Sequence, residues 1–182
     1  MAVPALDQFI TVREYLASSF EVDCDYVDGR LEERHLGEFD HARLQSLLDR
    51  WFGGHEEEWG IVAVVEQRVQ VSPTRFRVPD VCVLRAVEPI EQVVRTPPLI
   101  CIEIISPEDT LSRLGARVDD YLRMGVEHVW VIDPATRVGW QCGEAGWTHP
   151  VDGHFSIPGT EVFVSLPEIY RALDKVRQRD AT

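Results

Sequence analysis

Two apolar segments with an amphipathic segment between them constrain the fold of this chain more than any other feature. Residues 99–105 (LICIEII) and 128–132 (HVWVI) are almost wholly apolar, as is typical of strands that are covered on both faces. Residues 111–122 between them carry apolar side chains at helical spacing, and Gly125 follows as a helix stop. A strand, a helix and a second strand in this order predict a parallel β-α-β crossover unit.

The rest of the chain supplies further strands and helices around this unit. Thr11 and Glu14 form a capping-box pattern, and Asp28-Gly29 is typical of a two-residue hairpin turn. In chain order we expect a short helix after residue 11, a hairpin over 24–34, a helix over 40–52, strands over 61–71 and 75–85, a meander near 143–153, a strand over 161–166 and a last helix from about residue 165. The sequence therefore predicts one domain over residues 1–182, of the α/β class, with a mixed central β-sheet, a parallel β-α-β crossover and flanking helices.

The charge balance narrows the classes of partner. The chain has 18 basic and 31 acidic residues, a formal net charge of −13, and Lys175 is its single lysine. This balance argues against a protein that coats nucleic acid or an anionic membrane through long-range attraction, but it leaves room for a local basic site. No segment approaches the roughly 20 apolar residues that span a bilayer, and the first residues lack a secretory pattern. The four cysteines are dispersed singly, which favours buried free thiols in a reducing cytoplasm.

Glu103 has the clearest chemical implication, because it lies in the middle of the apolar segment 99–105. A carboxylate placed there loses water, which costs on the order of several kcal/mol unless the group is protonated, paired or bound to a metal. A structural ion pair with an arginine is one interpretation. A functional site is the other, and it requires a second acidic residue nearby.

Asp80 can provide that second carboxylate. It follows Pro79 at the start of the apolar segment 81–84, where a turn can direct its side chain toward a neighbouring strand. Two convergent carboxylates on adjacent strands form a hard oxygen site for Mg²⁺, which retains several waters and can activate one as a nucleophile.

Arg117 can bring a cation to the same place. On a helical wheel it lies about 60° from Leu114, at the border of the apolar face formed with Val118 and Tyr121. Its side chain can therefore reach along the sheet toward the carboxylates. The alternative is an arginine that packs its aliphatic stem on the helix flank.

Six segments in a fixed order carry a family resemblance. They are YVDGRLEER, DHARLQSLL, RVPDVCVL, PPLICIEIISPED, RVDDYLRMGVEHVWVIDP and EVFVSLPEIYRAL. In this order they resemble the Uma-type family, which is common in bacteria and whose members are described as putative restriction endonucleases. The resemblance covers residues 11–173, and it is most specific from PPLICIEIISPED to VWVIDP. It implies a restriction-endonuclease-like core of the PD-(D/E)XK nuclease superfamily.

The resemblance also implies roles for individual residues. Asp80 and Glu103 correspond to the two metal ligands, with Mg²⁺ or Mn²⁺ as the cofactor. The superfamily lysine, which this family carries on the following helix four residues before a tyrosine, corresponds to Arg117, because Tyr121 is that tyrosine. An arginine keeps the positive charge but cannot act as a general base. His41 stands at a histidine position typical of the family and would orient phosphate or water; an exposed residue at a helix start is the alternative.

These observations lead to one main hypothesis and two alternatives. The main hypothesis is a Mg²⁺-dependent endonuclease that hydrolyses DNA phosphodiester bonds, with Asp80, Glu103, Arg117 and His41 as its catalytic residues and Glu33 as a weaker, outer-shell candidate. The first alternative is a catalytically impaired relative that acts as a binding or scaffold protein. The second is a hydrolase of a smaller phosphoester. We further expect a bacterial, cytoplasmic protein that forms a homodimer, since enzymes that cut duplexes commonly pair two sites.

Overall fold

The computed structural model describes residues 9–18, 24–34, 38–86 and 91–177. Its helices are α1 (Val12–Ala17), α2 (Phe39–Gly53), α3 (Glu56–Trp59), α4 (Leu111–Met124) and α5 (Leu166–Arg177), with a 3₁₀ turn at Val151–Gly153. Its strands are β1 (Cys24–Val27), β2 (Arg30–Glu33), β3 (Ile61–Val65), β4 (Val69–Ser72), β5 (Arg75–Arg77), β6 (Val81–Arg85), β7 (Ile100–Ile104), β8 (His128–Asp133), β9 (Val138–Gly143), β10 (Gly146–Thr148), β11 (His154–Ser156) and β12 (Phe163–Ser165).

A six-stranded mixed sheet, in the order β10-β9-β8-β7-β6-β3, forms the centre of the fold. Strands β7 and β8 pair in parallel, and α4 connects them, so the predicted crossover is confirmed. The other neighbouring strands of this sheet pair antiparallel. The predicted α/β class with a mixed central sheet and flanking helices is therefore confirmed.

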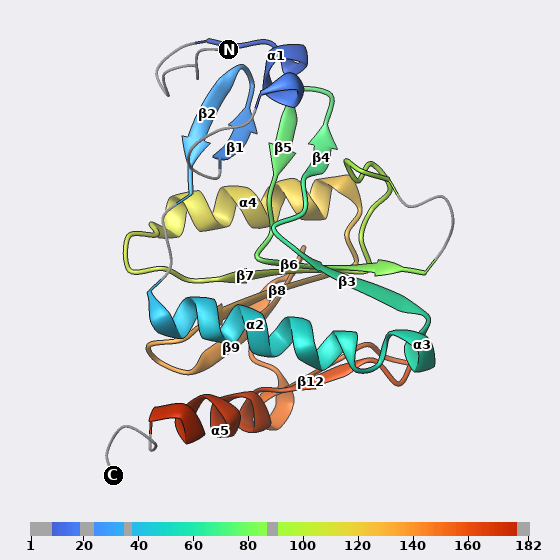
Figure 1. Ribbon diagram of the computed structural model, residues 1–182, viewed down its shortest axis with the longest axis vertical. Coiled ribbons are helices and arrows are strands. Elements are labelled where there is room, and N and C mark those ends of the chain that lie inside the picture. The colour runs from blue at the N-terminus through green and yellow to red at the C-terminus, as the bar shows by residue number, and fades with distance from the viewer. Residues whose placement is uncertain (1–8, 19–23, 35–37, 87–90, 178–182) are drawn as a thin grey trace.

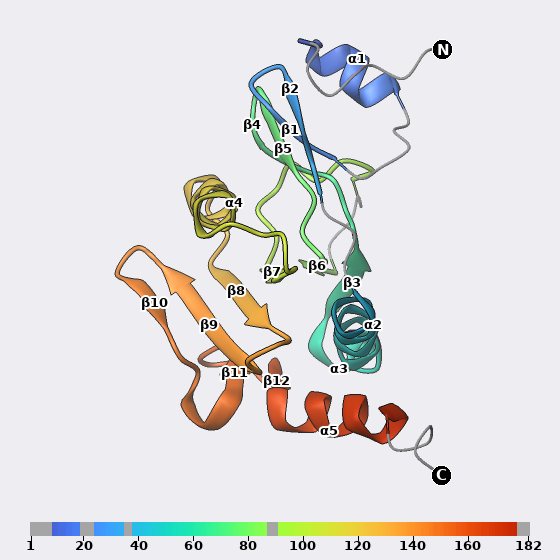
Figure 2. The same cartoon turned by 90° about the vertical axis from the view of Figure 1, so that its left-hand side faces the viewer.

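Helices cover both faces of this sheet, as Figures 1 and 2 show: α4 lies on one face, and α2 lies on the other with α5 beyond it. The alternation of side chains along β7 follows these layers. Ile100 and Ile102 belong to the apolar cluster that includes α2 and α5 residues, whereas Cys101 belongs to the cluster that includes α4 residues. Glu103, two residues after Cys101, therefore faces α4.

A smaller sheet, in the order β2-β1-β5-β4, lies on the far side of α4 (Figure 1). The sequence predicts single strands over 61–71 and 75–85, and the structure corrects both predictions. Each run contains two strands, because β3 and β6 pair in the large sheet while β4 and β5 pair in the small one. The first run bends at Glu66, which has a φ of 52°, and the second bends at Pro79, which has no amide hydrogen for a strand ladder.

Local sequence patterns set the ends of several elements as expected. The Thr11 hydroxyl accepts from the backbone N–H of Glu14, and the Glu14 carboxylate accepts in return from the backbone N–H of Thr11, which confirms the capping box. Helix α4 begins after Thr110, whose side chain accepts from the backbone N–H of Arg113, and it ends at Gly125, whose φ of +98° suits glycine. No helix within the described ranges has both the length and the apolar character needed to cross a bilayer.

Candidate active site

The antiparallel pairing of β6 with β7 brings the two acidic candidates together. Val81 pairs with Ile102, so Asp80, one residue before β6 begins, lies alongside Glu103. Both side chains point to the α4 face of the sheet and both are buried, with Glu103 completely so. The bend at Pro79 is therefore what directs the Asp80 carboxylate toward the neighbouring strand, as the sequence predicts.

The Asp80 carboxylate is held by three groups from different elements. Its Oδ2 accepts from the backbone N–H of Ile104 at 2.6 Å. Its Oδ1 accepts from Arg34 Nη2 at 2.6 Å and lies 3.5 Å from His41 Nε2. Burial alone would raise the pKa of Asp80, but Arg34, His41 and the Ile104 N–H together hold that pKa below its ordinary value. Asp80 is therefore a carboxylate at neutral pH.

The Glu103 carboxylate is more deeply buried than that of Asp80. Its Oε1 accepts from the Tyr121 hydroxyl at 2.6 Å, and its Oε2 lies 2.9 Å from Arg117 Nε and 3.6 Å from Arg34 Nη1. Burial raises the pKa of Glu103 above its ordinary value, and the attraction of Arg117 and Arg34 only partly offsets this effect. Asp80 adds to the increase because two neighbouring negative charges repel each other.

Arg117 reaches the acid pair from α4, as the helical wheel predicts. It is buried, and its Nη2 donates to Asp109 Oδ1 at 2.9 Å while its Nε faces Glu103. Burial alone would lower the pKa of Arg117, but Glu103 and Asp109 raise it above the ordinary value. Arg117 is therefore a fixed positive charge at this position.

His41 joins the site from the first turn of α2 and is not an exposed helix-start residue. Its Nε2 faces Asp80 Oδ1, and its Nδ1 lies 3.2 Å from the hydroxyl of Ser106, which follows β7. Burial lowers the pKa of His41, but the hydrogen bond and charge of Asp80 outweigh that effect and raise it overall. The end of β2, the start of α2 and the loop before α4 thus meet at one edge of the molecule, on the left in Figure 1.

Glu33, the outer-shell candidate, lies at the rim of this site. It is exposed at the end of β2 and borders a small cavity of about 20 Å³. The cavity is also lined by Arg34, His41, Ile104, Ser106, Asp109, Arg113 and Arg117. Its volume is comparable to the room that one water requires.

Sequence reasoning missed Arg34, which contacts both acidic candidates. The segment LEERH resembles a solvated charged run, and nothing in its spacing shows that Arg34 lies under the rim while Glu33 faces solvent. Asp25 was missed as well, although it stands between two apolar residues of β1, and that placement could have indicated its burial. Asp25 Oδ1 lies 3.8 Å from Arg34 Nη1.

Another buried arginine, Arg77, connects this site to the rest of the small sheet. Arg77 Nη1 donates to Asp25 Oδ2 at 2.9 Å and to Glu32 Oε2 at 2.8 Å, and Arg77 Nε donates to Asp120 Oδ2 at 2.9 Å. These contacts join β1, β2, β5 and α4. The network therefore fixes α4, and with it Arg117, against the hairpin that carries Arg34.

The acid pair has the donor chemistry of a divalent-cation site. Carboxylate oxygens are the ligands that Mg²⁺ prefers, and no donor among the described residues is aligned to hydrogen-bond the buried Glu103 Oε2. Within the described ranges there is no cluster of three or more His, Cys, Asp or Glu side chains suited to a metal ion. Two carboxylates suffice for Mg²⁺, which retains waters and takes further ligands from substrate phosphates. Asp80 and Glu103 therefore fit such an ion.

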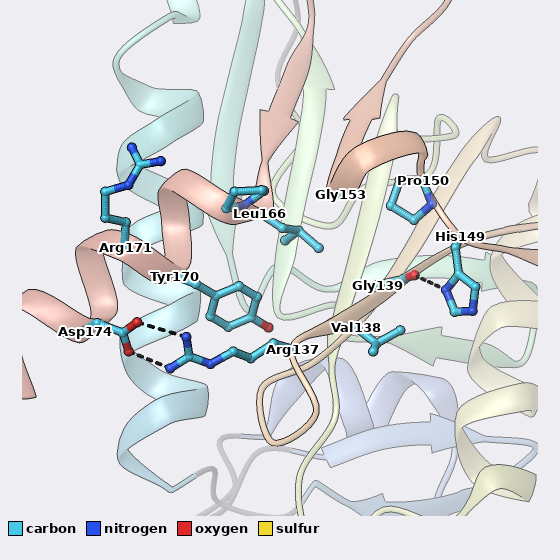
Figure 3. A pocket seen from close by; sticks show the side chains of 11 residues that line it. Arg137, Val138, Gly139, His149, Pro150, Gly153, Leu166, Tyr170, Arg171 and Asp174 are labelled. Carbon is cyan, nitrogen blue, oxygen red and sulfur yellow. Dashed lines mark hydrogen bonds and ion pairs between the residues drawn. The ribbon is translucent and has the colours of Figure 1, made fainter.

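A larger pocket of about 630 Å³ lies between the β8–β9 turn and α5, on the opposite side of the sheet from α4 (Figure 3). Two of its charged side chains are engaged with each other, since Arg137 Nη1 donates to Asp174 at 2.9 Å, and the Arg137 guanidinium lies 5.2 Å from the centre of the Tyr170 ring. His149 Nδ1 lies 3.0 Å from the carbonyl oxygen of Gly139. The pocket holds none of the predicted site residues, so we place the candidate active site at the acid pair.

A family model described as "Putative restriction endonuclease", Uma2, matches residues 12–140. The chain belongs to the Uma2 family. The part of this Uma2 chain that the family model matches contains Arg34, His41, Asp80, Glu103 and Arg117, but not α5. The resemblance noted in the sequence is thus confirmed, and the family description supports a nuclease.

One solved structure supports the fold of this Uma2 protein. A crystal structure described as "a putative nuclease belonging to DUF820" from Anabaena variabilis ATCC 29413 aligns with a TM-score of 0.76 at 20% identity, over 89% of this chain and 98% of that one. A DrdV–DNA complex aligns with a TM-score of 0.38 at 16% identity, over 73% of this chain and 10% of that one, which is only a partial overlap. No curated protein matches the chain.

Proposed function

We propose that this Uma2 protein is a divalent-metal-dependent endonuclease that hydrolyses phosphodiester bonds of DNA. The observation that carries the proposal is the convergence of Asp80 and Glu103 on one buried edge, with Arg117 and His41 beside them. Asp80 and Glu103 would hold the ion, with Mg²⁺ or Mn²⁺ as the expected species. When bound, the ion supplies Lewis-acid stabilisation of the phosphoryl oxygens and lowers the pKa of water.

The role of Arg117 follows from its fixed charge. A guanidinium stabilises the negative charge that develops on the phosphoryl oxygens during in-line attack, and its planar group can orient the scissile phosphate. Because Arg117 does not lose its proton, it takes no part in deprotonating the nucleophile. Arg117 is therefore an electrostatic residue in this proposal.

His41 has a related role. Burial lowers the pKa of His41, but the interaction with Asp80 outweighs it and raises the pKa overall, which shifts the imidazole toward its protonated form. In that form His41, in the first turn of α2, can donate a hydrogen bond to a phosphate oxygen. It is assigned to orient the phosphate.

The test is a cleavage assay with purified protein, plasmid DNA and Mg²⁺ or Mn²⁺. We expect the wild-type chain to cut the DNA and Glu103→Gln to lose about 10²-fold or more of the rate, since the variant lacks one carboxylate ligand while keeping the shape of the side chain. Glu161→Gln is the matched control, because Glu161 is exposed near β12 and lies outside the site. Cleavage that persists in Glu103→Gln would show that the activity comes from another site or a contaminant.

A second candidate function, a non-catalytic binding or scaffold protein, is favoured by one observation. The acid pair is already neutralised within the chain, since Arg34 contacts both carboxylates and Arg117 contacts Glu103. Calorimetric titration with Mn²⁺ separates the two candidates. Saturable binding that is lost in Asp80→Ala supports the enzyme, whereas the absence of binding at millimolar Mn²⁺ both in wild type and in Arg34→Gln, which removes a cation from the acid pair, supports the scaffold.

We also propose a homodimer. The aromatic residues in and near the Gly53-Gly54 turn offer only part of an interface, because Phe52 is fully buried and Trp51 and Trp59 pack on Phe163. Phe163 is exposed and the two tryptophans are half-buried, so some apolar surface remains at that place. Light scattering should give twice the 20.8 kDa chain mass, and a monomer mass would contradict the proposal.

A further inference from the structure

Arg34 lies against both proposed metal ligands. Its Nη2 donates to Asp80 Oδ1 at 2.6 Å, and its Nη1 lies 3.6 Å from Glu103 Oε2. The oxygens that it approaches are the Asp80 oxygen not held by the Ile104 N–H and the Glu103 oxygen not held by Tyr121. An ion that binds both carboxylates would use these two oxygens, although Arg117 Nε also lies 2.9 Å from Glu103 Oε2 and His41 Nε2 lies 3.5 Å from Asp80 Oδ1.

The charges at the site explain why a cation is needed there. Asp25, Asp80, Glu103 and Asp109 place four carboxylates near one another, and their basic partners are Arg34, Arg77, Arg117 and His41, with Arg77 paired to Asp25 alone among the four. Without Arg34, Asp80 and Glu103 would face each other as buried like charges that only Arg117 and His41 offset. A divalent ion between the two carboxylates would offset the same repulsion.

The space at the site does not admit both cations. The cavity beside Arg34 has a volume of about 20 Å³, room for about one water, and neither Asp80 nor Glu103 lines it, so it offers no second cation position between the two carboxylates. Mg²⁺ keeps several of its waters and sits about 2 Å from its oxygen ligands, closer than the Arg34 nitrogens. An ion bound to both carboxylates would overlap the guanidinium group.

The position of Arg34 in the fold permits its movement. It directly follows β2, an edge strand of the small sheet, so a side-chain rotation breaks no ladder hydrogen bond. Its contacts at Nη1 are also long, at 3.6 Å to Glu103 and 3.8 Å to Asp25, and no acceptor among the described residues is aligned to that atom. The hydrogen bond to Asp80 is thus the main contact to be broken.

We propose that Arg34 is a built-in competitor of the divalent ion: its guanidinium occupies the cation position between Asp80 and Glu103, and an ion binds there only when Arg34 has left. This inference rests on the metal site of the proposed function, and it adds that Arg34 controls the binding of the ion at that site. The protein then has low affinity for the free ion. Ligands that draw Arg34 away, such as the phosphates of a bound polyanion, favour ion binding.

The experiment is calorimetric titration of the full chain with Mn²⁺ alone, in wild type, Arg34→Gln and Arg30→Gln. Arg30 is exposed on the same strand, so Arg30→Gln makes the same change in net charge away from the acid pair. We expect Arg34→Gln to bind Mn²⁺ roughly tenfold more tightly or better, and Arg30→Gln to match wild type. Equal affinity in all three chains, or no binding in any of them, would overturn the proposal.

Thermal unfolding gives an independent readout. Mn²⁺ should raise the melting temperature of Arg34→Gln more than that of wild type, because a ligand stabilises the folded state in proportion to its affinity. If Arg34→Gln fails to fold without metal, Arg34→Lys replaces it in the titration. Lysine presents one compact charge that cannot contact both carboxylates, so tighter Mn²⁺ binding than wild type is expected, and unchanged affinity overturns the proposal.

The outcomes also separate this inference from the nuclease proposal. Tighter Mn²⁺ binding in Arg34→Gln without DNA cleavage by any variant leaves the competition intact and overturns the nuclease. DNA cleavage that is lost in Glu103→Gln, together with equal Mn²⁺ affinity in wild type and Arg34→Gln, supports the nuclease and overturns the competition.

Discussion

Glu103 shows how one residue can be both costly to bury and central to a site. Its carboxylate has no exposed surface, and its pKa is raised, yet Tyr121, Arg117 and Arg34 surround it with one hydroxyl and two cations. Such a group destabilises the fold unless each partner stays in place. Substituting these partners should therefore change the free energy of unfolding, the rate of DNA cleavage, or both, and each can be measured by itself.

Tyr121→Phe tests the hydroxyl that donates to Glu103. Removing it leaves Glu103 Oε1 buried without that donor, so we expect the free energy of unfolding to fall by about 1–3 kcal/mol. Urea unfolding measures the change. Tyr170→Phe is the control, because its hydroxyl donates to the Asp133 carbonyl oxygen at 3.1 Å in a part-buried place, and it should lose less. Equal losses in the two variants would contradict a special role for the Glu103 contact.

Arg117→Lys tests whether arginine is the working residue at this position. Arg117 faces Glu103 with Nε and Asp109 with Nη2, and a lysine cannot serve both carboxylates at once. We expect Arg117→Lys to cleave DNA about tenfold or more slowly than wild type in the Mg²⁺ assay. A faster variant would instead show that the position functions best with lysine and that arginine impairs the site.

At the scale of elements, the site depends on how three layers are held in register. The small sheet, α4 and the large sheet each contribute residues, and Arg77 joins β1, β2 and β5 to α4 through Asp25, Glu32 and Asp120. Asp25 also receives a hydrogen bond from the backbone N–H of Val78 at 3.0 Å. This network fixes the chain just before the bend that carries Asp80.

Arg77→Met tests that network. The substitution keeps an apolar stem but leaves buried carboxylates without their cation, so we expect a loss of about 3–5 kcal/mol in the free energy of unfolding. Arg85→Met is the control, because Arg85 is exposed and its pair with Glu127 at 3.4 Å should contribute at most about 1 kcal/mol. A similar, small effect of both substitutions in a chemical denaturation series would contradict the proposed function of the network.

At the scale of the whole molecule, the charge of −13 and the acid pair have to be considered together. The net charge opposes approach to a polyanion, whereas the cations at the site gather at one edge where the two carboxylates lie. Binding a divalent ion would make that edge more positive without changing the remaining surface. A phosphate bound at that edge would interact with the local charge there more than with the net charge of the chain.

The four cysteines give a whole-molecule test of packing. Cys24, Cys82, Cys101 and Cys142 are buried and form no disulfide in the part of the chain that the structure describes, and burial raises the pKa of the Cys142 thiol to about 12. Because thiolates are the reactive species, we expect no reaction with DTNB at pH 8 in the native protein and four thiols per chain after unfolding in guanidinium. A thiol that reacts within minutes in the native protein would contradict this packing.

The crossover unit, the mixed sheet and the places of Asp80, Glu103 and Arg117 can be predicted from the sequence, because they depend on local periodicity and on the pairing of adjacent strands. The division of the runs 61–71 and 75–85 between two sheets, and the position of the end of β2 over the acid pair, become visible only in the folded chain. A charged run such as LEERH has the same pattern whether it faces water or a buried carboxylate. The proposed competition between Arg34 and the metal ion depends on the contact of Arg34 with Asp80. No sequence pattern indicates that contact, because an ion pair between distant segments produces no periodicity.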